Sequence, residues 1–170
     1  TVTISSITGA GTLGISIAAS TANDTAGNIA AAAGPSTTFT VTAPTPPDYA
    51  ITTSAGVLTI TDSSGNADTL AISEPSAGNI LFTATGRTFS LNGAANTSGN
   101  SGNISLSGIT SIVVNAAAGA DSISVGSFTA ASYAMTINGG ADADTLSIAG
   151  SYSTAIANSN GSGASNLTLD

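Results

Sequence analysis

The sequence contains no cysteine, histidine, lysine or tryptophan. Without cysteine, the chain can form neither a disulfide bond nor a thiolate metal site. Without histidine, it lacks the commonest general base and the commonest transition-metal ligand. The many serines therefore have no histidine or lysine beside them that would activate a hydroxyl as a nucleophile. We predict from these absences that the chain is not an enzyme.

Charge is scarce and almost all of one sign. Nine acidic residues face a single base, Arg87, which gives a formal net charge of −8. Such a surface repels phosphate, so we expect neither nucleic acid nor anionic lipid headgroups as partners. No apolar run reaches the roughly 18 residues that a membrane-spanning helix needs. We therefore expect no membrane insertion.

The residues that are abundant are small, apolar or hydroxylated. Hydrophobic residues make up 41% of the chain and charged residues only 6%, which differs from the low hydrophobicity and high charge of a disordered chain. A length of 170 residues is enough for one or two domains. Few charges, no lysine and many hydroxyl groups are typical of a long-lived extracellular protein. We predict an extracellular or cell-surface location.

Residues 1–43 alternate between apolar and polar side chains in the way that half-buried strands do. We predict strands over 1–7, 13–17 and 37–42, with a polar loop over 21–28. Residues 9–41, GAGTLGISIAASTANDTAGNIAAAAGPSTTFTV, resemble the closing strands of the bacterial Ig-like repeats of giant surface adhesins. In that family an xDxAGN loop joins the last two strands. The resemblance implies that 1–43 is the C-terminal part of an Ig-like β-sandwich.

The same resemblance suggests a calcium site in the loop, because its counterpart in the adhesins often holds calcium at an interdomain junction. The candidate ligands are Asp24 and Asn28. An Ig-like sandwich needs about seven strands, however, and only three are predicted here. The missing strands would leave a bare sheet edge and an exposed inner face. Either a processing boundary separates this chain from a longer precursor, or another subunit donates the missing strands.

A proline-rich segment follows. Residues 44–48 read Pro-Thr-Pro-Pro-Asp, and proline lacks the amide donor that a central strand needs. Three prolines so close together favour a stiff, extended linker. We place a domain boundary there and assign 49–170 to a second domain.

The second domain is predicted to contain many short strands separated by turns rich in glycine, serine and asparagine. The predicted strands are 49–53, 57–61, 69–73, 79–84, 88–92, 103–106, 110–115, 122–125, 134–138, 145–149, 154–157 and 166–169. No segment has the periodicity of a helix. The last strand stops within its pattern, so we expect strand pairing with another chain at 166–170 or at 1–7.

Within this domain the sequence repeats itself. Residues 115–125 (NAAAGADSISV) and 138–148 (NGGADADTLSI) match at an offset of 23 residues, with Asp121 equivalent to Asp144 and Ile123 equivalent to Leu146. A short period is typical of a solenoid, in which one coil buries its apolar face only by stacking on the next. We therefore predict a β-solenoid-like region over 49–170.

Residues 139–147 (GGADADTLS) also resemble the nonapeptide of RTX proteins, G-G-x-G-x-D-x-(apolar)-x, and degenerate copies extend the resemblance over 112–149. In RTX proteins the turns of stacked coils bind calcium, which makes Asp121, Asp142 and Asp144 candidate metal ligands. The copies are imperfect, because Asp142 replaces the third glycine and alanines replace the first glycine pair at 116–117. The period is also longer than that of an RTX coil. The alternative is that each aspartate caps its own turn.

We conclude from the sequence that the chain is all-β, with partial Ig-like sandwich strands followed by a β-solenoid-like region of the parallel β-helix or β-roll type. The expected function is a structural subunit of an extracellular assembly: a surface layer, sheath, filament or giant adhesin. Copies of the chain, or adjacent modules of a larger precursor, would be joined by β-strand complementation between subunits. The alternative is a calcium-stiffened adhesin segment that binds a surface or glycan ligand. Sequons for attached glycans begin at Asn23, Asn96, Asn103, Asn160 and Asn166.

Overall fold

The computed structural model describes residues 9–128, 133–149, 156–160 and 166–169, the last two ranges by their backbone alone. All regular structure in these residues is β-strand, so the predicted all-β class is confirmed. Among the described residues there is thus no helix with the length and apolar character to cross a membrane. The chain divides into two compact units, Thr1–Thr45 and Pro46–Asp170, and the division falls inside the proposed linker. The strand predicted over 1–7 lies outside the described residues.

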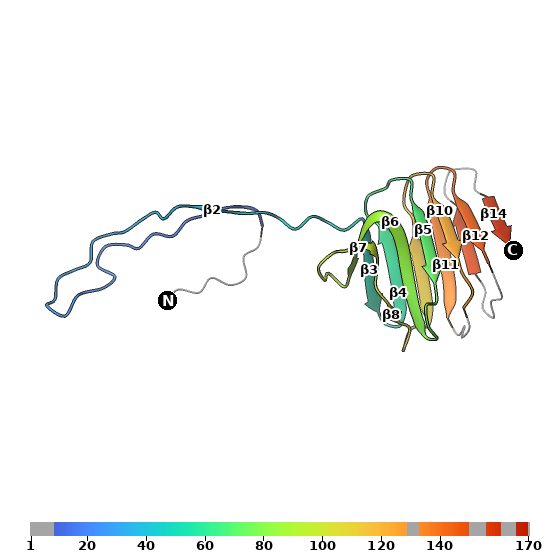
Figure 1. Ribbon diagram of the computed structural model, residues 1–170, viewed down its shortest axis with the longest axis horizontal. Coiled ribbons are helices and arrows are strands. Elements are labelled where there is room, and N and C mark those ends of the chain that lie inside the picture. Colours follow the sequence, from blue (N-terminus) through green and yellow to red (C-terminus); the bar gives the residue numbers. More distant parts are fainter. Residues whose placement is uncertain (1–8, 129–132, 150–155, 161–165, 170) are drawn as a thin grey trace. The chain divides into compact units, whose positions relative to one another are not determined.

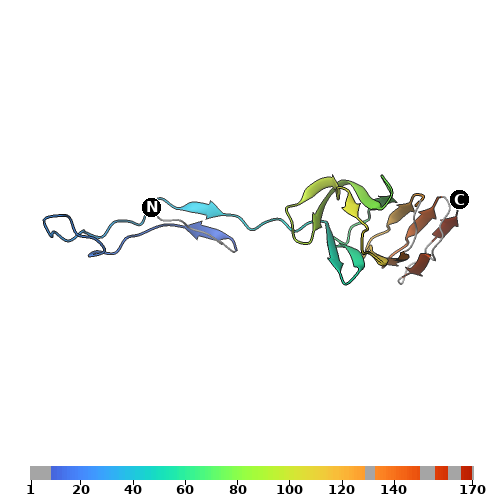
Figure 2. The ribbon, with the colours of Figure 1, turned by 90° about the horizontal axis from the view of Figure 1, so that it is seen from below.

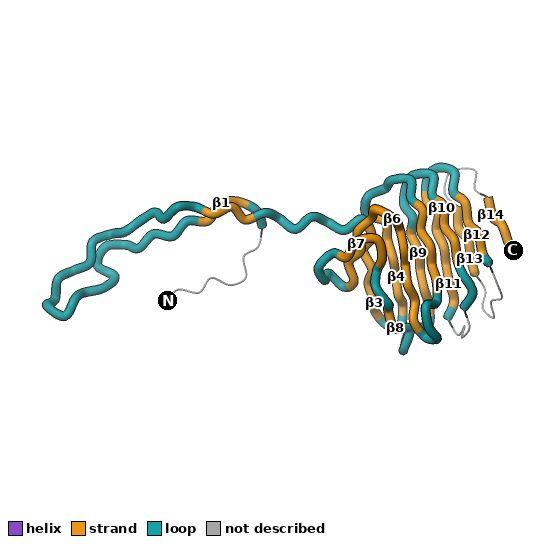
Figure 3. Tube along the Cα trace, in the orientation of Figure 1, coloured by secondary structure: helices purple, strands orange, loops and turns teal. Residues whose placement is uncertain are grey.

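Unit 1 is a long, irregular hairpin. Strand β1 (Gly11–Leu13) pairs antiparallel with β2 (Phe39–Val41), and beyond them only isolated bridges join the two arms. The strands predicted over 13–17 and 37–42 are therefore shorter than expected, and most of the hairpin is drawn as loop in Figure 3. One reason is that the Ile15 amide donates to the Ser36 side-chain hydroxyl, which interrupts the backbone ladder. The predicted Ig-like sandwich is not confirmed by this two-stranded sheet.

Unit 2 is built from one twelve-stranded sheet that wraps almost completely around its core (Figure 1). Its strands run in the sheet order β13-β11-β9-β4-β3-β6-β5-β10-β12-β14, with β7 and β8 paired to β6 off this path. The strands are β3 (Tyr49–Ser54), β4 (Val57–Asp62), β5 (Thr69–Ser73), β6 (Asn79–Leu91), β7 (Thr97–Asn100), β8 (Ile104–Ser105), β9 (Ser111–Asn115), β10 (Ser122–Val125), β11 (Ala134–Gly140), β12 (Thr145–Ile148), β13 (Ile156–Asn160) and β14 (Asn166–Leu169).

Most of the sheet consists of two parallel stacks. One stack is β4-β9-β11-β13 and the other is β5-β10-β12-β14, so each pair of successive strands forms one coil of the chain. Between the second and third coils Ile123 pairs with Leu146 and Val125 with Ile148, which confirms the 23-residue repeat. Residues paired between the first and second coils are further apart in the sequence, because strands β6, β7 and β8 are inserted between β5 and β9.

The inserted strands close one end of the stacks. Strand β3 forms a hairpin with β4, and β6 pairs with both β3 and β5, which joins the two stacks. Two sequence predictions are corrected here. Residues 79–84 and 88–92 belong to one strand, β6, because the chain continues through Gly86 with only a shift in register opposite β7. Strand β7 lies between the strands predicted over 88–92 and 103–106, where the sequence predicts only a turn.

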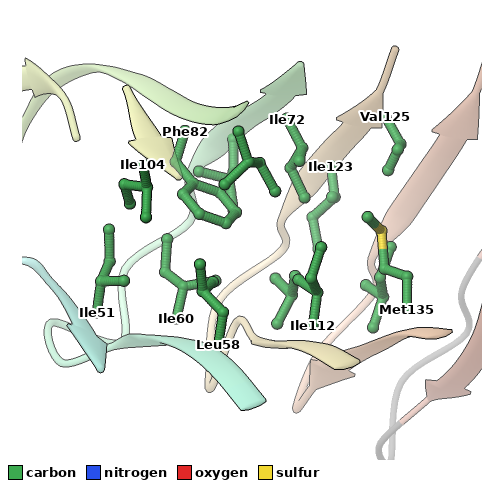
Figure 4. Close-up of a cluster of buried hydrophobic side chains, with 14 of the residues drawn as sticks. Ile51, Leu58, Ile60, Ile72, Phe82, Ile104, Ile112, Ile123, Val125 and Met135 are labelled. Carbon is green, nitrogen blue, oxygen red and sulfur yellow. The ribbon is translucent and has the colours of Figure 1, made fainter. Parts of the chain in front are cut away.

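The core lies between the two stacks. Alternate residues of β4, β9, β5 and β10 point inward, and Figure 4 shows Ile60 and Ile112 from one stack facing Ile72 and Ile123 from the other. In-register pairing places Leu58, Ile112 and Met135 in one buried row. Figure 2, seen from below, shows the strands of the two stacks as two layers. Each coil therefore covers the apolar side chains of the next coil.

Candidate functional site

The most unusual polar feature of unit 2 is a row of buried aspartates inside the stacks. Asp68, Asp121 and Asp144 each come immediately before a strand of the β5-β10-β12 stack, and each is less than one-tenth exposed. The Asp68 amide donates to Asp121 Oδ1 at 2.8 Å, and the Asp121 amide donates to Asp144 Oδ1 at 3.0 Å. The carboxylates of Asp121 and Asp144 therefore each join their own coil to the preceding one. We call this row the aspartate ladder.

The first rung of the aspartate ladder is capped by side chains from the closed end. Tyr49 on β3 donates its hydroxyl to Asp68 Oδ2 at 2.8 Å, and Arg87 on β6 donates Nε to Asp68 Oδ1 at 2.5 Å. Arg87 also pairs with the more exposed Asp48 at 3.7 Å. Burial, followed by the hydrogen bond to Asp68, raises the pKa of Tyr49 above its usual range. In later coils the carboxylate accepts an amide from the preceding coil. Among the described strands no coil precedes Asp68 in the stack, and Arg87, the single base of the sequence, binds its carboxylate instead.

The later rungs have no such cap. Within the described residues, Asp121 Oδ2 and Asp144 Oδ2 are buried and have no hydrogen-bond partner. Burial of an ionised carboxylate without full hydrogen bonding is costly. The pKa of Asp121 is raised to about 7, chiefly by burial and also by the charges of Asp144, Asp68 and Asp62, against the opposing effect of the hydrogen bond from the Asp68 amide. Asp121 therefore takes up a proton as the pH falls through about 7.

A dependence of stability on pH follows. A carboxyl group with a raised pKa binds a proton more tightly in the folded than in the unfolded state, so ionisation costs folding free energy. The Asp121 contribution is fully present below the unfolded value near 3.8 and is lost as pH rises toward about 7. We expect the melting temperature of unit 2, measured by circular dichroism with a chelator present, to fall by several degrees between pH 5 and pH 8.

The matched variant is Asp121→Asn, which keeps an oxygen acceptor for the Asp68 amide but cannot ionise. Its melting temperature should change much less between pH 5 and pH 8. The hydrogen-bonded carboxylates of Asp24 and Asp48 have lowered pKa values, so their contributions change only in more acidic solution. A wild-type profile that is flat, or that rises over this window, would show that Asp121 is ionised at no cost.

The third candidate metal ligand of this region, Asp142, lies away from the ladder. It is exposed in the turn between β11 and β12, and its Oδ2 accepts a hydrogen bond from the Gly119 amide at 3.1 Å. Asp142 and Gly119 occupy equivalent positions of the repeat, with φ of 76° and 105°. Ala117 and Gly140 are equivalent in the same way, with φ of 72° and 94°. The residues that replace glycine in the repeat thus keep the left-handed backbone that glycine favours.

The other predicted ligand pair, in unit 1, forms a self-contained turn. Asp24 Oδ1 accepts from the amides of Ala26 and Asn28, and Asp24 Oδ2 accepts from the Asn28 side-chain amide at 2.8 Å. These carboxylate oxygens are thus already used by the turn. In the described part of the chain, no group of three acidic side chains is gathered as a metal ion would require. Calcium binding remains a prediction, and nothing in the proposed function depends on it.

A second polar row runs along the other stack. The Asn138 side-chain amide donates to Asn115 Oδ1 at 2.7 Å, and the Asn115 side-chain amide donates to Thr61 Oγ1 at 3.4 Å. These residues are paired in register between β4, β9 and β11. The two stacks therefore each carry one polar row that fixes how coils are aligned.

Sequence reasoning identified part of this site. Asp121 and Asp144 were singled out, although as metal ligands, and the structure brings them together in one row with Asp68. Asp68 lies in a third, more degenerate copy of the repeat at 66–72 (NADTLAI), in which only the aspartate and Leu70 match. The signal that identifies all three is the shared pattern of aspartate, a hydroxyl residue and an apolar residue at 68–70, 121–123 and 144–146. The role of Arg87 had a simpler signal, because it is the only base among nine acids.

The site has a structural role. The carboxylates of Asp121 and Asp144 accept hydrogen bonds from backbone amides of the preceding coil, and the Arg87 guanidinium neutralises Asp68. Comparison of the chain with protein-family models, curated proteins and solved structures gives no match.

Proposed function

We propose that this chain is a structural segment of an extracellular assembly, such as a surface layer, sheath, filament or giant adhesin. Its unit 2 is a β-solenoid that joins a neighbour by strand pairing at its open end. One observation carries the proposal. Among the described strands, β13 and β14 are the two ends of the sheet order and each pairs on one side only. Such edges are templates for another strand.

The interpretation as a solenoid is supported by the way the coils depend on each other. The rows Leu58-Ile112-Met135 and Leu70-Ile123-Leu146 run through successive coils, and each row is buried. A single coil would expose its part of every row to water. A stack of this kind gains stability with each added neighbour, so an uncovered last coil favours association.

The open edge also lacks the features that usually prevent edge pairing. Natural sheets block their edges with lysine, proline or inward-pointing charge. The sequences of β13 (IANSN) and β14 (NLTL) contain no proline and no charged residue. The closed end is different, because β6 pairs there with β5 of one stack and with β3, which pairs with β4 of the other stack. We therefore propose that association through unit 2 uses one end only.

The proposal extends to unit 1. Its hairpin is an incomplete part of an Ig-like sandwich, which strands from outside this hairpin would complete. The support is the resemblance of residues 9–41 to such repeats together with the small two-stranded sheet that they form.

A lysine at the open edge tests the proposal for unit 2. Thr168 on β14 is in register with Ser147, which is in register with Ser124 on β10. We expect Thr168→Lys to prevent association through this edge, because lysine on an edge strand is one of the features by which natural sheets prevent edge pairing. The matched control is Ser124→Lys, which places the same charge in the same row on an exposed site of an inner strand.

Light scattering and negative-stain microscopy of the full chain, over a range of concentrations, give the result. The wild type and Ser124→Lys should form larger particles as concentration rises, while Thr168→Lys should lose the contact made by the solenoid end. Equal particle sizes for Thr168→Lys and Ser124→Lys would contradict the proposed edge contact. A wild type without any association would contradict the assembly role itself.

A further inference from the structure

The linker enters unit 2 in the middle of its sheet. Strand β3 follows the linker directly and lies between β4 and β6 in the sheet order. It pairs antiparallel with β4 from Tyr49 to Ser54 and parallel with β6 from Tyr49 to Ile51. Tension in the linker would therefore pull β3 against two neighbours at once. A strand at the edge of a sheet would resist less, because it is hydrogen-bonded on one side only.

The prolines of the linker leave a single residue to continue this pairing. Pro46 and Pro47 have no amide hydrogen, so they cannot donate to a sheet. Asp48, the next residue, is bound on both sides. Its amide donates to Thr88 Oγ1 on β6 at 3.0 Å, and its carbonyl oxygen accepts the amide of Ser63, just after β4, at 2.7 Å. Asp48 therefore ties the end of the linker to the same two strands that flank β3.

The side chain of Asp48 adds to the contact with β6. Its Oδ2 accepts hydrogen bonds from the Thr88 amide and the Thr88 hydroxyl, both at 2.8 Å. Its Oδ1 lies 3.7 Å from Arg87 Nη1. The hydrogen bonds from Thr88, the amide first, lower the pKa of Asp48, so its carboxylate is ionised at neutral pH. We call Asp48, Ser63, Arg87 and Thr88 the entry clamp.

The entry clamp is connected directly to the aspartate ladder. Its Arg87 binds Asp68, and the hydroxyl of Tyr49 donates to the same carboxylate. The Tyr49 ring is buried and stacks on Phe89, with the ring centroids 5.0 Å apart. From Asp68 the ladder continues to the second and third coils. The residues that receive the linker are thus joined by hydrogen bonds to the coils behind them.

We propose that the entry clamp is a force-bearing fastening, which passes tension in the linker to the first coil and keeps β3 in the sheet. The inference rests on the proposed role in an assembly and specifies how unit 2 withstands force there. The Asp48 side chain is 27% exposed, so its ion pair with Arg87 adds little to equilibrium stability. Its position is what matters, because the hydrogen bonds of the clamp are the first that tension from the linker must break.

The absence of cysteine allows force to be applied at chosen residues. Single-molecule pulling on the full chain, with handles at the exposed positions Pro44→Cys and Ser124→Cys, loads the linker against the middle of the stack. Thr88→Val removes the two hydrogen bonds of the Thr88 hydroxyl and keeps the branched shape. We expect the unfolding rate at constant force to rise about tenfold, the effect of two ordinary hydrogen bonds on a rate. The matched control, Thr83→Val, makes the same replacement on β6 opposite β5 and should change the rate much less.

A second pair of handles separates a role in bearing force from a purely structural one. With Ala55→Cys in place of Pro44→Cys, tension enters at the other end of β3 and does not reach the clamp first. Thr88→Val should then have an effect no larger than that of Thr83→Val. Equal effects of Thr88→Val in the two geometries would overturn the proposal, as would equal effects of the two variants with the linker under tension.

Folding is checked separately. Every tyrosine of the chain belongs to unit 2, so an unchanged near-ultraviolet circular dichroism spectrum shows that unit 2 is intact. If Thr88→Val alters the spectrum, Asp48→Ala removes the carboxylate from the other side of the same contacts and is judged by the same outcomes. Single molecules do not associate, so failure of the clamp leaves the open edge standing. The edge is tested by Thr168→Lys against Ser124→Lys, and its failure leaves the measured clamp unchanged.

Discussion

Replacement of Arg87 by methionine is expected to lower the free energy of unfolding of unit 2 by about 3–5 kcal/mol, the usual cost of removing one partner from a buried ion pair. The side chain of Asp68 is 2% exposed, and Arg87 is the only cation that reaches it. Without the guanidinium, the Asp68 carboxylate would still accept the hydrogen bond from the Tyr49 hydroxyl, but the negative charges of its acidic neighbours would no longer be offset. The loss should appear in urea unfolding followed by circular dichroism.

The control for this variant is Asp48→Asn. Asp48 also pairs with Arg87, but its side chain is 27% exposed, and exposed ion pairs contribute about 0–1 kcal/mol. Addition of Asp68→Asn to Arg87→Met should restore part of the loss, because the buried charge is then gone as well. If Arg87→Met costs no more than Asp48→Asn, the capping of the aspartate ladder by Arg87 contributes little to stability.

Gly140→Ala is expected to have the second largest effect, a loss of about 3 kcal/mol from overpacking together with the strain of a left-handed backbone. Gly140 lies in β11 with φ of 94°, and a Cβ atom there would overlap the carbonyl oxygen of Ala117 in the preceding coil. That carbonyl accepts the Ala141 amide at 2.8 Å, so it cannot move freely. The substitution should therefore separate the second and third coils at this turn.

Gly93→Ala isolates the contribution of the backbone. Gly93 has φ of 75°, and a Cβ atom there would meet no atom within 4 Å. Its alanine variant should lose only about 1 kcal/mol, from the left-handed conformation. Urea unfolding of both variants gives the comparison. Similar losses for the two variants would mean that the close approach of the coils at Gly140 costs little to relieve.

The sequence was informative where the fold repeats. Asp121 and Asp144, with the apolar residues that follow each, recur at the same offset that the strands use in pairing, because identical coils need identical contacts. Alternation of apolar residues placed most strands of unit 2 within a few residues. The aspartates were also recognised as important, although they face inward and accept backbone amides instead of gathering at a turn.

The closed end was much harder to predict. The residues of β6 do not indicate that this strand joins the two stacks, because its pairing with β3 and β5 depends on residues elsewhere in the chain. Asp68 was hard to assign for the same reason, since the inserted strands place it 53 residues from Asp121 instead of 23. The hairpin of unit 1 shows a different limit. Its alternating residues indicate strands, but the Ser36 hydroxyl takes the place of a backbone partner for Ile15.

The position of Arg87 also determines how the folded chain meets proteases that cut after basic residues. The chain offers them one bond, between Arg87 and Thr88, and that bond lies within β6. The Arg87 guanidinium is bound by Asp68, and the Thr88 amide donates to Asp48. Cleavage therefore requires β6 to detach from the sheet first. The rate of this single trypsin cut would then report how often the closed end opens, because the rate follows the population of the opened state.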